Sequence, residues 1–167
     1  MLFNSVIYFV FLTIAVLAYW RLKWRQQNVF LLIASYVFYG YWDWRFLSLM
    51  WASTLVDFFC AKIIAASDDK IKRRSLLTLS LVLNFGFLGF FKYFNFFVDS
   101  ASVGLEAFGI HVPVKLLSIV LPPGISFYTF QAVAYIVDVY FKKLEPSKNL
   151  IDYALFISLF PHLIAGR

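Results

Sequence analysis

LPPGISFYTFQAVAYIVDVYFKK, residues Leu121 to Lys143, is the stretch around which the chain is organised. Its Pro-Pro-Gly start interrupts an apolar run, because proline lacks a backbone donor and glycine tolerates backbone angles that other residues avoid. From Ile125 onward the spacing predicts a helix with two unlike faces. The polar stripe consists of Tyr128, Gln131, Tyr135, Asp138 and Lys142. The apolar stripe consists of Phe127, Phe130, Ala134, Val137 and Phe141.

The composition decides the class of protein. Hydrophobic residues make up 62% of the 167 residues, aromatic residues 22% and charged residues 14%, and the mean hydropathy is +0.79. Soluble domains average about 45–50% apolar and about 25% charged residues. One small core cannot bury this excess of apolar residues, so the sequence predicts an all-α polytopic transmembrane protein.

The apolar residues fall into about six segments, and a helical span of a bilayer needs about 20 residues. The predicted segments are 2–20, 28–42, 46–64, 75–91, 120–141 and 151–166. Asn84, Gly86 and Gly89 in the fourth segment predict a close helix approach or a local irregularity. The longest connection is expected over 99–118.

Lysine and arginine are concentrated in the first, third and fifth connections. These hold Arg21, Lys23 and Arg25; Lys62, Lys70, Lys72, Arg73 and Arg74; and Lys142, Lys143 and Lys148. Basic residues gather on the cytoplasmic side of membrane proteins. We therefore expect the N-terminus outside, and the basic pI of about 9.5 needs no nucleic-acid partner.

Polar groups inside a bilayer must face protein or a water-filled cavity. The polar stripe of the helix predicted from Ile125 is therefore the best indication of where function lies. The alternative is that Tyr128 and Gln131 only hydrogen-bond to neighbouring helices while Asp138 pairs with Lys142. Asp57 lies inside the third segment. A carboxylate there needs a partner, and the favoured interpretation is that Asp57 forms a structural ion pair with a basic residue of another helix. The alternative is that Asp57 contacts a proton or a substrate.

Two residue types with possible chemistry carry little signal. Cys60 is the only cysteine, which excludes an intrachain disulfide and a thiolate metal site, and no metal site is predicted. His162 follows Pro161 in the last segment, where it could act in acid–base catalysis. A buried histidine that holds irregular backbone in place is the favoured interpretation, because no motif of a soluble enzyme accompanies it.

Four blocks resemble one known family. They are FLLIASYVFYGYWDWRF (Phe30 to Phe46), LGFFKYFNFFVDS (Leu88 to Ser100), LPPGISFYTFQAVAYIVDVYF (Leu121 to Phe141) and NLIDYALFISLFPHLIAG (Asn149 to Gly166). In this order and spacing they resemble the membrane-bound O-acyltransferases, and most of all the bacterial alginate O-acetyltransferase branch. The resemblance implies a ring of tilted helices around a thinned centre, crossed by a tunnel. Tyr128, Gln131, Tyr135, Asp138 and His162 would then line or brace that tunnel.

The resemblance also implies an activity and its partners. Members pass an acetyl group from a cytoplasmic donor, here acetyl-coenzyme A, across the bacterial inner membrane to periplasmic or extracellular acetyltransferase partners and finally to a polysaccharide such as alginate. The family histidine would lie beyond Arg167, so the chain corresponds to the N-terminal part and is expected to be inactive alone. The alternatives are an inactive truncated scaffold and a transporter or channel, and a transporter would predict an inverted repeat that the chain does not contain.

Overall fold

The computed structural model describes residues 6–106 and 124–159, and every regular element in these ranges is an α-helix. The helices are α1 (Val6–Arg21), α2 (Trp24–Ala66), α3 (Lys70–Glu106), α4 (Ile125–Tyr140) and α5 (Leu150–Ser158). Two stretches are long and apolar enough to cross a membrane, the 23 residues Trp44–Ala66 of α2 and the 25 residues Lys70–Phe94 of α3. The predicted all-α membrane fold is confirmed.

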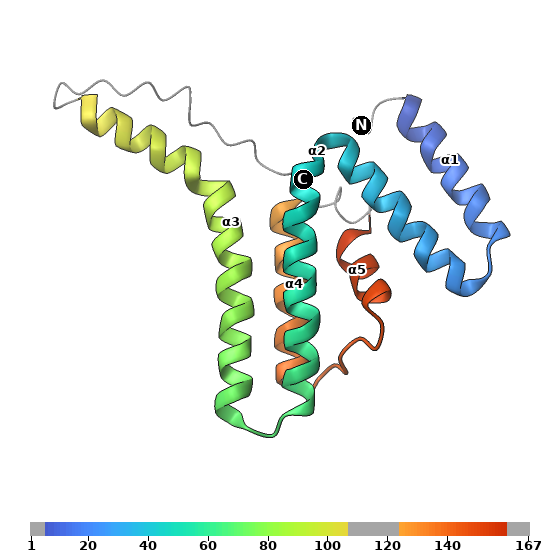
Figure 1. The fold of residues 1–167 in the computed structure, drawn as a ribbon. Coiled ribbons are helices and arrows are strands. Elements are labelled where there is room, and N and C mark those ends of the chain that lie inside the picture. Colours follow the sequence, from blue (N-terminus) through green and yellow to red (C-terminus); the bar gives the residue numbers. More distant parts are fainter. Residues whose placement is uncertain (1–5, 107–123, 160–167) are drawn as a thin grey trace.

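Helix α2 joins two segments that we expected to be separate. Its 43 residues run through Asp43 and Arg45, where the sequence predicted a connection at the membrane surface. A straight helix of this length would span about 65 Å, which is twice the roughly 30 Å hydrocarbon core of a bilayer. Figure 1 shows how the chain resolves this mismatch, because α2 is bent into two arms. The charged residues are thus part of a helix and not of a loop.

Helix α3 also extends beyond its predicted segment, and the expected connection at 99–106 is helical. Gly86 and Gly89 were expected to mark a close helix approach or a local irregularity, but α3 is continuous through both, and apart from its own nearby backbone no described atom lies within 4 Å of a Cβ placed at either residue. That expectation is wrong for the two glycines. Asn84 of the same segment is buried.

Helix α4 begins where the sequence predicted. Gly124 precedes it with a φ of 74°, a left-handed conformation that a side chain at this position would disfavour. The helix ends near Lys142, whose φ is 59°. The Pro-Pro-Gly signal therefore fixed the start of α4 correctly at the residue level.

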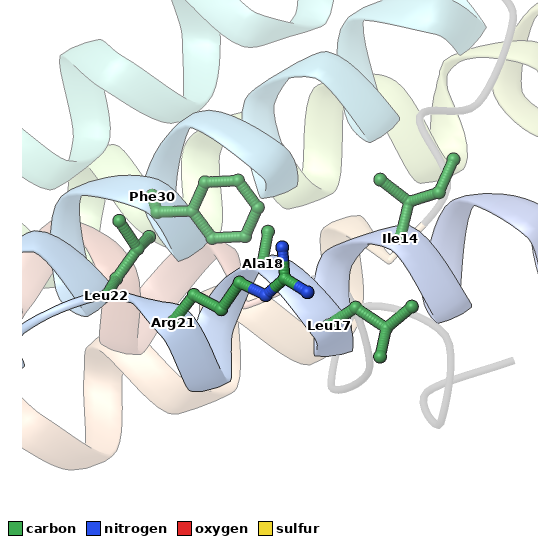
Figure 2. Close-up of a pocket in the computed structure, with 6 residues that line it drawn as sticks. All are labelled: Ile14, Leu17, Ala18, Arg21, Leu22 and Phe30. Atoms are coloured by element: carbon green, nitrogen blue, oxygen red, sulfur yellow. The ribbon is translucent and has the colours of Figure 1, made fainter.

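The second arm of α2 is the centre of the packing. It lies beside α3 and α4, and α2 also has extensive contacts with α5 (Figure 1). The buried core between these helices includes Met50, Ile64, Ile136 and Tyr153. Helix α1 packs along the first arm of α2, and a groove remains open between the two helices (Figure 2).

In Figure 1 each of the three basic connections joins the lower ends of its two helices, and the α1–α2 connection lies higher than the other two. A guanidinium nitrogen of Arg73, in the first turns of α3, donates to the backbone carbonyl of Tyr140 at the end of α4. The Asn28 amide near the start of α2 donates to the Asp152 carboxylate of α5 at 2.9 Å. These two contacts tie together elements that flank all three connections, which face the same side of the chain, and we call this side the basic end.

Candidate functional site

A cluster of buried polar side chains joins α2 to α3. Asp57 of α2 has no exposed surface. Its Oδ1 accepts a hydrogen bond from Ser80 Oγ at 2.5 Å. Asn84 Nδ2 donates to both carboxylate oxygens, to Oδ1 at 3.0 Å and to Oδ2 at 2.9 Å. Ser53 completes the group by donating from Oγ to Asn84 Oδ1 at 3.0 Å. We call these four residues the Asp57 cluster.

The partners of Asp57 correct the favoured interpretation from the sequence. We expected a basic residue of another helix, and among residues 6–106 and 124–159 the side chains that donate to Asp57 are instead the neutral ones of Ser80 and Asn84. Buried polar groups must be hydrogen-bonded, and neutral donors meet this need without burying a second charge. A signal for the partners existed in the sequence, because Ser80 and Asn84 are four residues apart and share one face of α3.

The stripe of α4 is turned toward the other helices. Tyr128 and Tyr135 are only 3% and 6% exposed, whereas Phe130 and Phe141 of the apolar stripe are 56% and 62% exposed. Gln131 is half-buried, and its Nε2 donates to the backbone carbonyl of Phe156 on α5 at 2.8 Å. The polar side of α4 therefore faces protein.

Tyr135 also holds the connection between α4 and α5. Its hydroxyl oxygen accepts a hydrogen bond from the backbone N–H of Ser147 at 2.9 Å. Asp138, one turn further on, is half-buried, and its backbone carbonyl accepts from the N–H of Lys143 at 2.9 Å. The C-terminal half of the stripe thus fixes the path of the chain at the basic end.

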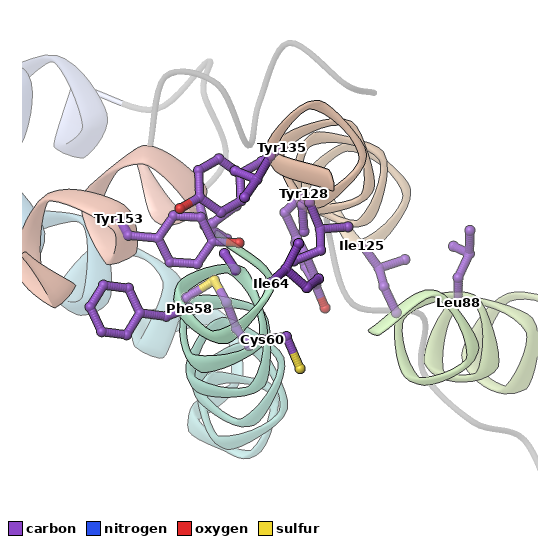
Figure 3. Close-up of a cluster of buried hydrophobic side chains, with 14 of the residues drawn as sticks. Phe58, Cys60, Ile64, Leu88, Ile125, Tyr128, Tyr135 and Tyr153 are labelled. Atoms are coloured by element: carbon purple, nitrogen blue, oxygen red, sulfur yellow. The ribbon is translucent and has the colours of Figure 1, made fainter. Parts of the chain in front are cut away.

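An aromatic contact continues the stripe into α5. The ring centroids of Tyr135 and Tyr153 are 4.5 Å apart, and Tyr153 is 1% exposed. Figure 3 shows the two rings side by side, with Phe58 and Cys60 of α2 nearby. Phe58 stacks on Tyr153 at 6.1 Å. Sequence reasoning did not select Tyr153, because a tyrosine in an apolar segment is common and its partner lies on another helix.

The structure thus brings Tyr128, Gln131 and Tyr135 into one buried region between α2, α4 and α5. Asp57 lies on the same arm of α2, on the side that meets α3. His162 lies outside the described residues, and Lys142 is exposed at the end of α4. The site is therefore built mainly from hydrogen-bonded and stacked side chains on three helices around the second arm of α2.

This architecture, an apolar helical bundle with buried polar groups, defines an integral membrane protein, and curated relatives specify it further. The chain is 42% identical over 168 residues to the probable alginate O-acetylase AlgI of Pseudomonas aeruginosa and 40% identical over 168 residues to that of Azotobacter vinelandii, and each match covers 99% of this chain. It is 31% identical over 196 residues to the peptidoglycan O-acetyltransferase of Helicobacter pylori, again over 99% of this chain.

The chain spans about a third of the length of these relatives, namely 32%, 34% and 36%. The resemblance to the alginate O-acetyltransferase branch of the membrane-bound O-acyltransferases is confirmed by these matches, and their extent fits an N-terminal part of such a protein. No family model matches the chain, and no solved structure matches it either.

Proposed function

We propose that this chain forms part of an O-acetyltransferase that moves acetyl groups from a cytoplasmic donor across the membrane to an extracellular polysaccharide. The observation that carries the proposal is the identity of about 40% over 99% of the chain to proteins named as alginate O-acetylases. The donor is acetyl-coenzyme A and the acceptor is a polymer such as alginate. Periplasmic or extracellular acetyltransferase proteins receive the group on the outer side.

The role of the stripe in this function is to brace the path of the acetyl group. Tyr128 and Tyr135 pack tightly against neighbouring helices, and the Gln131 amide is bonded to the backbone of α5. Hydrogen bonds and stacking of this kind hold helices at fixed distances, and a path through a membrane depends on such distances. His162 and Asp138 belong to the same proposed set of bracing or lining residues.

The proposed orientation places the basic end in the cytoplasm and the N-terminus outside, in the bacterial inner membrane. The support is that the three connections richest in lysine and arginine each join the lower ends of their helices in Figure 1. Positive charge marks the cytoplasmic side of a multi-pass protein. A cytoplasmic donor would therefore approach the end where Arg73 and Tyr140 meet.

A segment exchange tests the proposal. Residues 1–167 replace the matched segment of the Pseudomonas aeruginosa relative, and the chimera is expressed in a strain that lacks its own copy. We expect acetylated alginate to be restored, as measured by the acetyl content of purified polymer. A chimera that reaches the membrane at the normal level and leaves the alginate unacetylated would contradict the proposal.

The bracing role is tested in the same chimera. Replacing Tyr128 and Gln131 together with leucine removes the hydroxyl and the bond to Phe156, and we expect a clear loss of acetylation at an unchanged protein level. Phe130→Leu is the matched control, because Phe130 lies on the same helix but is 56% exposed on the opposite face. Unchanged acetylation in the double variant would show that the stripe does not serve the transfer.

A further inference from the structure

The groove between α1 and the first arm of α2 combines apolar walls with one cation. It has a volume of about 510 Å³ and is lined by Ile14, Leu17, Ala18, Arg21, Leu22 and Phe30. This volume lies within the roughly 300–1,000 Å³ that is typical of ligand pockets. Five of the six lining residues offer only carbon atoms of their side chains, so the groove suits an apolar chain.

The position of Arg21 gives the groove its chemistry. Figure 2 shows the side chain lying back along α1, with its guanidinium group beside Ala18. Side chains of a helix point toward its N-terminus, which accounts for this direction. Arg21 is exposed, and no carboxylate within 6–106 and 124–159 forms an ion pair with it. A cation at the edge of an apolar groove is thus available to an anion.

The apolar walls of the groove are exposed. Ile14 and Leu17, which line it, are 61% and 63% exposed, and Trp20 on the same helix is 78% exposed. In a membrane protein such surfaces contact lipid, and tryptophan is enriched at the level of the headgroups. An occupant can therefore enter from the bilayer with its headgroup at the basic end of the molecule.

We propose that this groove binds an anionic phospholipid, with an acyl chain along Ile14, Leu17 and Phe30 and the phosphate on the Arg21 guanidinium. Arginine suits this role because its planar group forms paired, charge-assisted hydrogen bonds with phosphate oxygens. Lys23 is exposed two residues further on and adds positive charge at the same level. Basic pockets between helices at the cytoplasmic surface bind anionic headgroups in this way.

Native mass spectrometry of the purified chain in mild detergent measures the binding directly. The probes are dioleoyl phosphatidylglycerol, which is anionic, and dioleoyl phosphatidylcholine, which is zwitterionic. We expect the chain to retain phosphatidylglycerol in preference to phosphatidylcholine. Arg21→Gln should weaken the retention of phosphatidylglycerol about fivefold, because it removes the attraction between one basic side chain and the anionic headgroup. The retention of phosphatidylcholine should be unchanged.

Two further variants separate the charge from the groove. Ala18→Phe fills the groove beside the guanidinium and should lower the retention of both lipids. Arg74→Gln removes an exposed cation at the same end of the molecule but outside the groove, and should change neither. Equal effects of Arg21→Gln and Arg74→Gln, or equal retention of the two lipids by the unaltered chain, would overturn the proposal.

A cross-linking experiment identifies the occupant in the longer protein. A photoreactive amino acid replaces Ala18 in the chimera described above, and the membranes are irradiated after growth in radioactive phosphate. We expect the label to join the protein as a cross-linked phospholipid. A cross-link to another part of the polypeptide would overturn the proposal. Both outcomes are read independently of acetylation, so a failure of the proposed activity does not affect them.

Discussion

Asp57 of α2 and Ser80 of α3 share a hydrogen bond of 2.5 Å in a region where neither side chain has any exposed surface. Asn84, one turn beyond Ser80, binds the same carboxyl group through its amide. The bond is therefore one part of a group that connects the two stretches long enough to span a membrane. Since each buried polar atom depends on the others, the cluster fixes the position of α3 against α2.

Removing the carboxyl group should destabilise the fold. Asp57→Leu leaves the Ser80 hydroxyl without its acceptor and leaves the Asn84 amide only its bond to the Ser80 carbonyl, and an unsatisfied buried group costs about 1–3 kcal/mol. Asp57→Asn keeps one carbonyl acceptor and should lose less. Thermal unfolding in lipid nanodiscs, followed by the monodisperse fraction on size-exclusion chromatography, should rank the unaltered chain above the Asn variant and the Leu variant lowest.

Thr54→Val is the control for the loss of a buried hydroxyl. Thr54 is 2% exposed on the same helix, but it donates to the Met50 carbonyl of its own helix and not to a neighbour. We expect a small effect, because no contact between helices is lost. A Leu variant of Asp57 as stable as the Thr54 variant would show that the Asp57 cluster does not hold α2 and α3 together.

The glycines of α2 and α3 should differ in their response to alanine. A Cβ at Gly40 would lie 2.9 Å from Leu47 Cδ1, while a Cβ at Gly86 would meet nothing within 4 Å. Alanine is favoured over glycine in a helix by about 1 kcal/mol. Gly86→Ala should therefore leave the thermal stability unchanged or raise it, whereas Gly40→Ala should lose this gain because the Leu47 side chain must move.

The double variant Gly40→Ala/Leu47→Ala provides the cross-check on Gly40. If the contact with Leu47 is the cause, the effect of Gly40→Ala measured in a Leu47→Ala background should be as favourable as that of Gly86→Ala. A Gly86→Ala variant that unfolds at a much lower temperature would instead mean that α3 is closely approached at this residue.

The sequence was sufficient to predict local features that depend on single residue types. Gly124 follows two prolines, and no other common residue adopts its φ of 74° at so little cost, so the start of α4 could be read directly. The two faces of α4 were also readable, because spacings of three and four define the sides of a helix. In both cases the physical cause lies within one turn of the chain.

The features that could not be predicted depend on other helices. Asp43 and Arg45 resembled a surface connection, yet α2 continues through them, because a helix satisfies its backbone groups wherever no proline interrupts it. The sequence showed that burying the Asp57 carboxylate costs free energy, but it could not identify Ser80 as the hydrogen-bond partner. The partner depends on how α2 and α3 are aligned. The contact of Tyr135 with Tyr153 joins α4 to α5 and needed the same information.

Gly124 should be the most sensitive residue at the start of α4. Alanine at a φ of 74° costs about 1–2 kcal/mol, because its Cβ crowds the following carbonyl. We expect Gly124→Ala to lower the thermal unfolding temperature in nanodiscs, and Gly124→Asn to lower it less, since asparagine tolerates left-handed backbone better. Equal stability of the alanine variant and the unaltered chain would contradict the observed backbone conformation.

The orientation makes a prediction that labelling can check. In a Cys60→Ala background, which removes the single cysteine, new cysteines replace Lys23, Asp68 and Lys148, one in each basic connection and all exposed. A membrane-impermeant maleimide added to intact spheroplasts should leave all three unlabelled until the membrane is permeabilised, because the basic end faces the cytoplasm.

Tyr41→Cys is the control and should react from outside. Tyr41 is 65% exposed in α2 and lies beyond the apolar run that follows Lys23. Labelling of the three basic connections on different sides of the membrane would contradict their placement on one side of the chain, and labelling of all three from outside would reverse the proposed orientation.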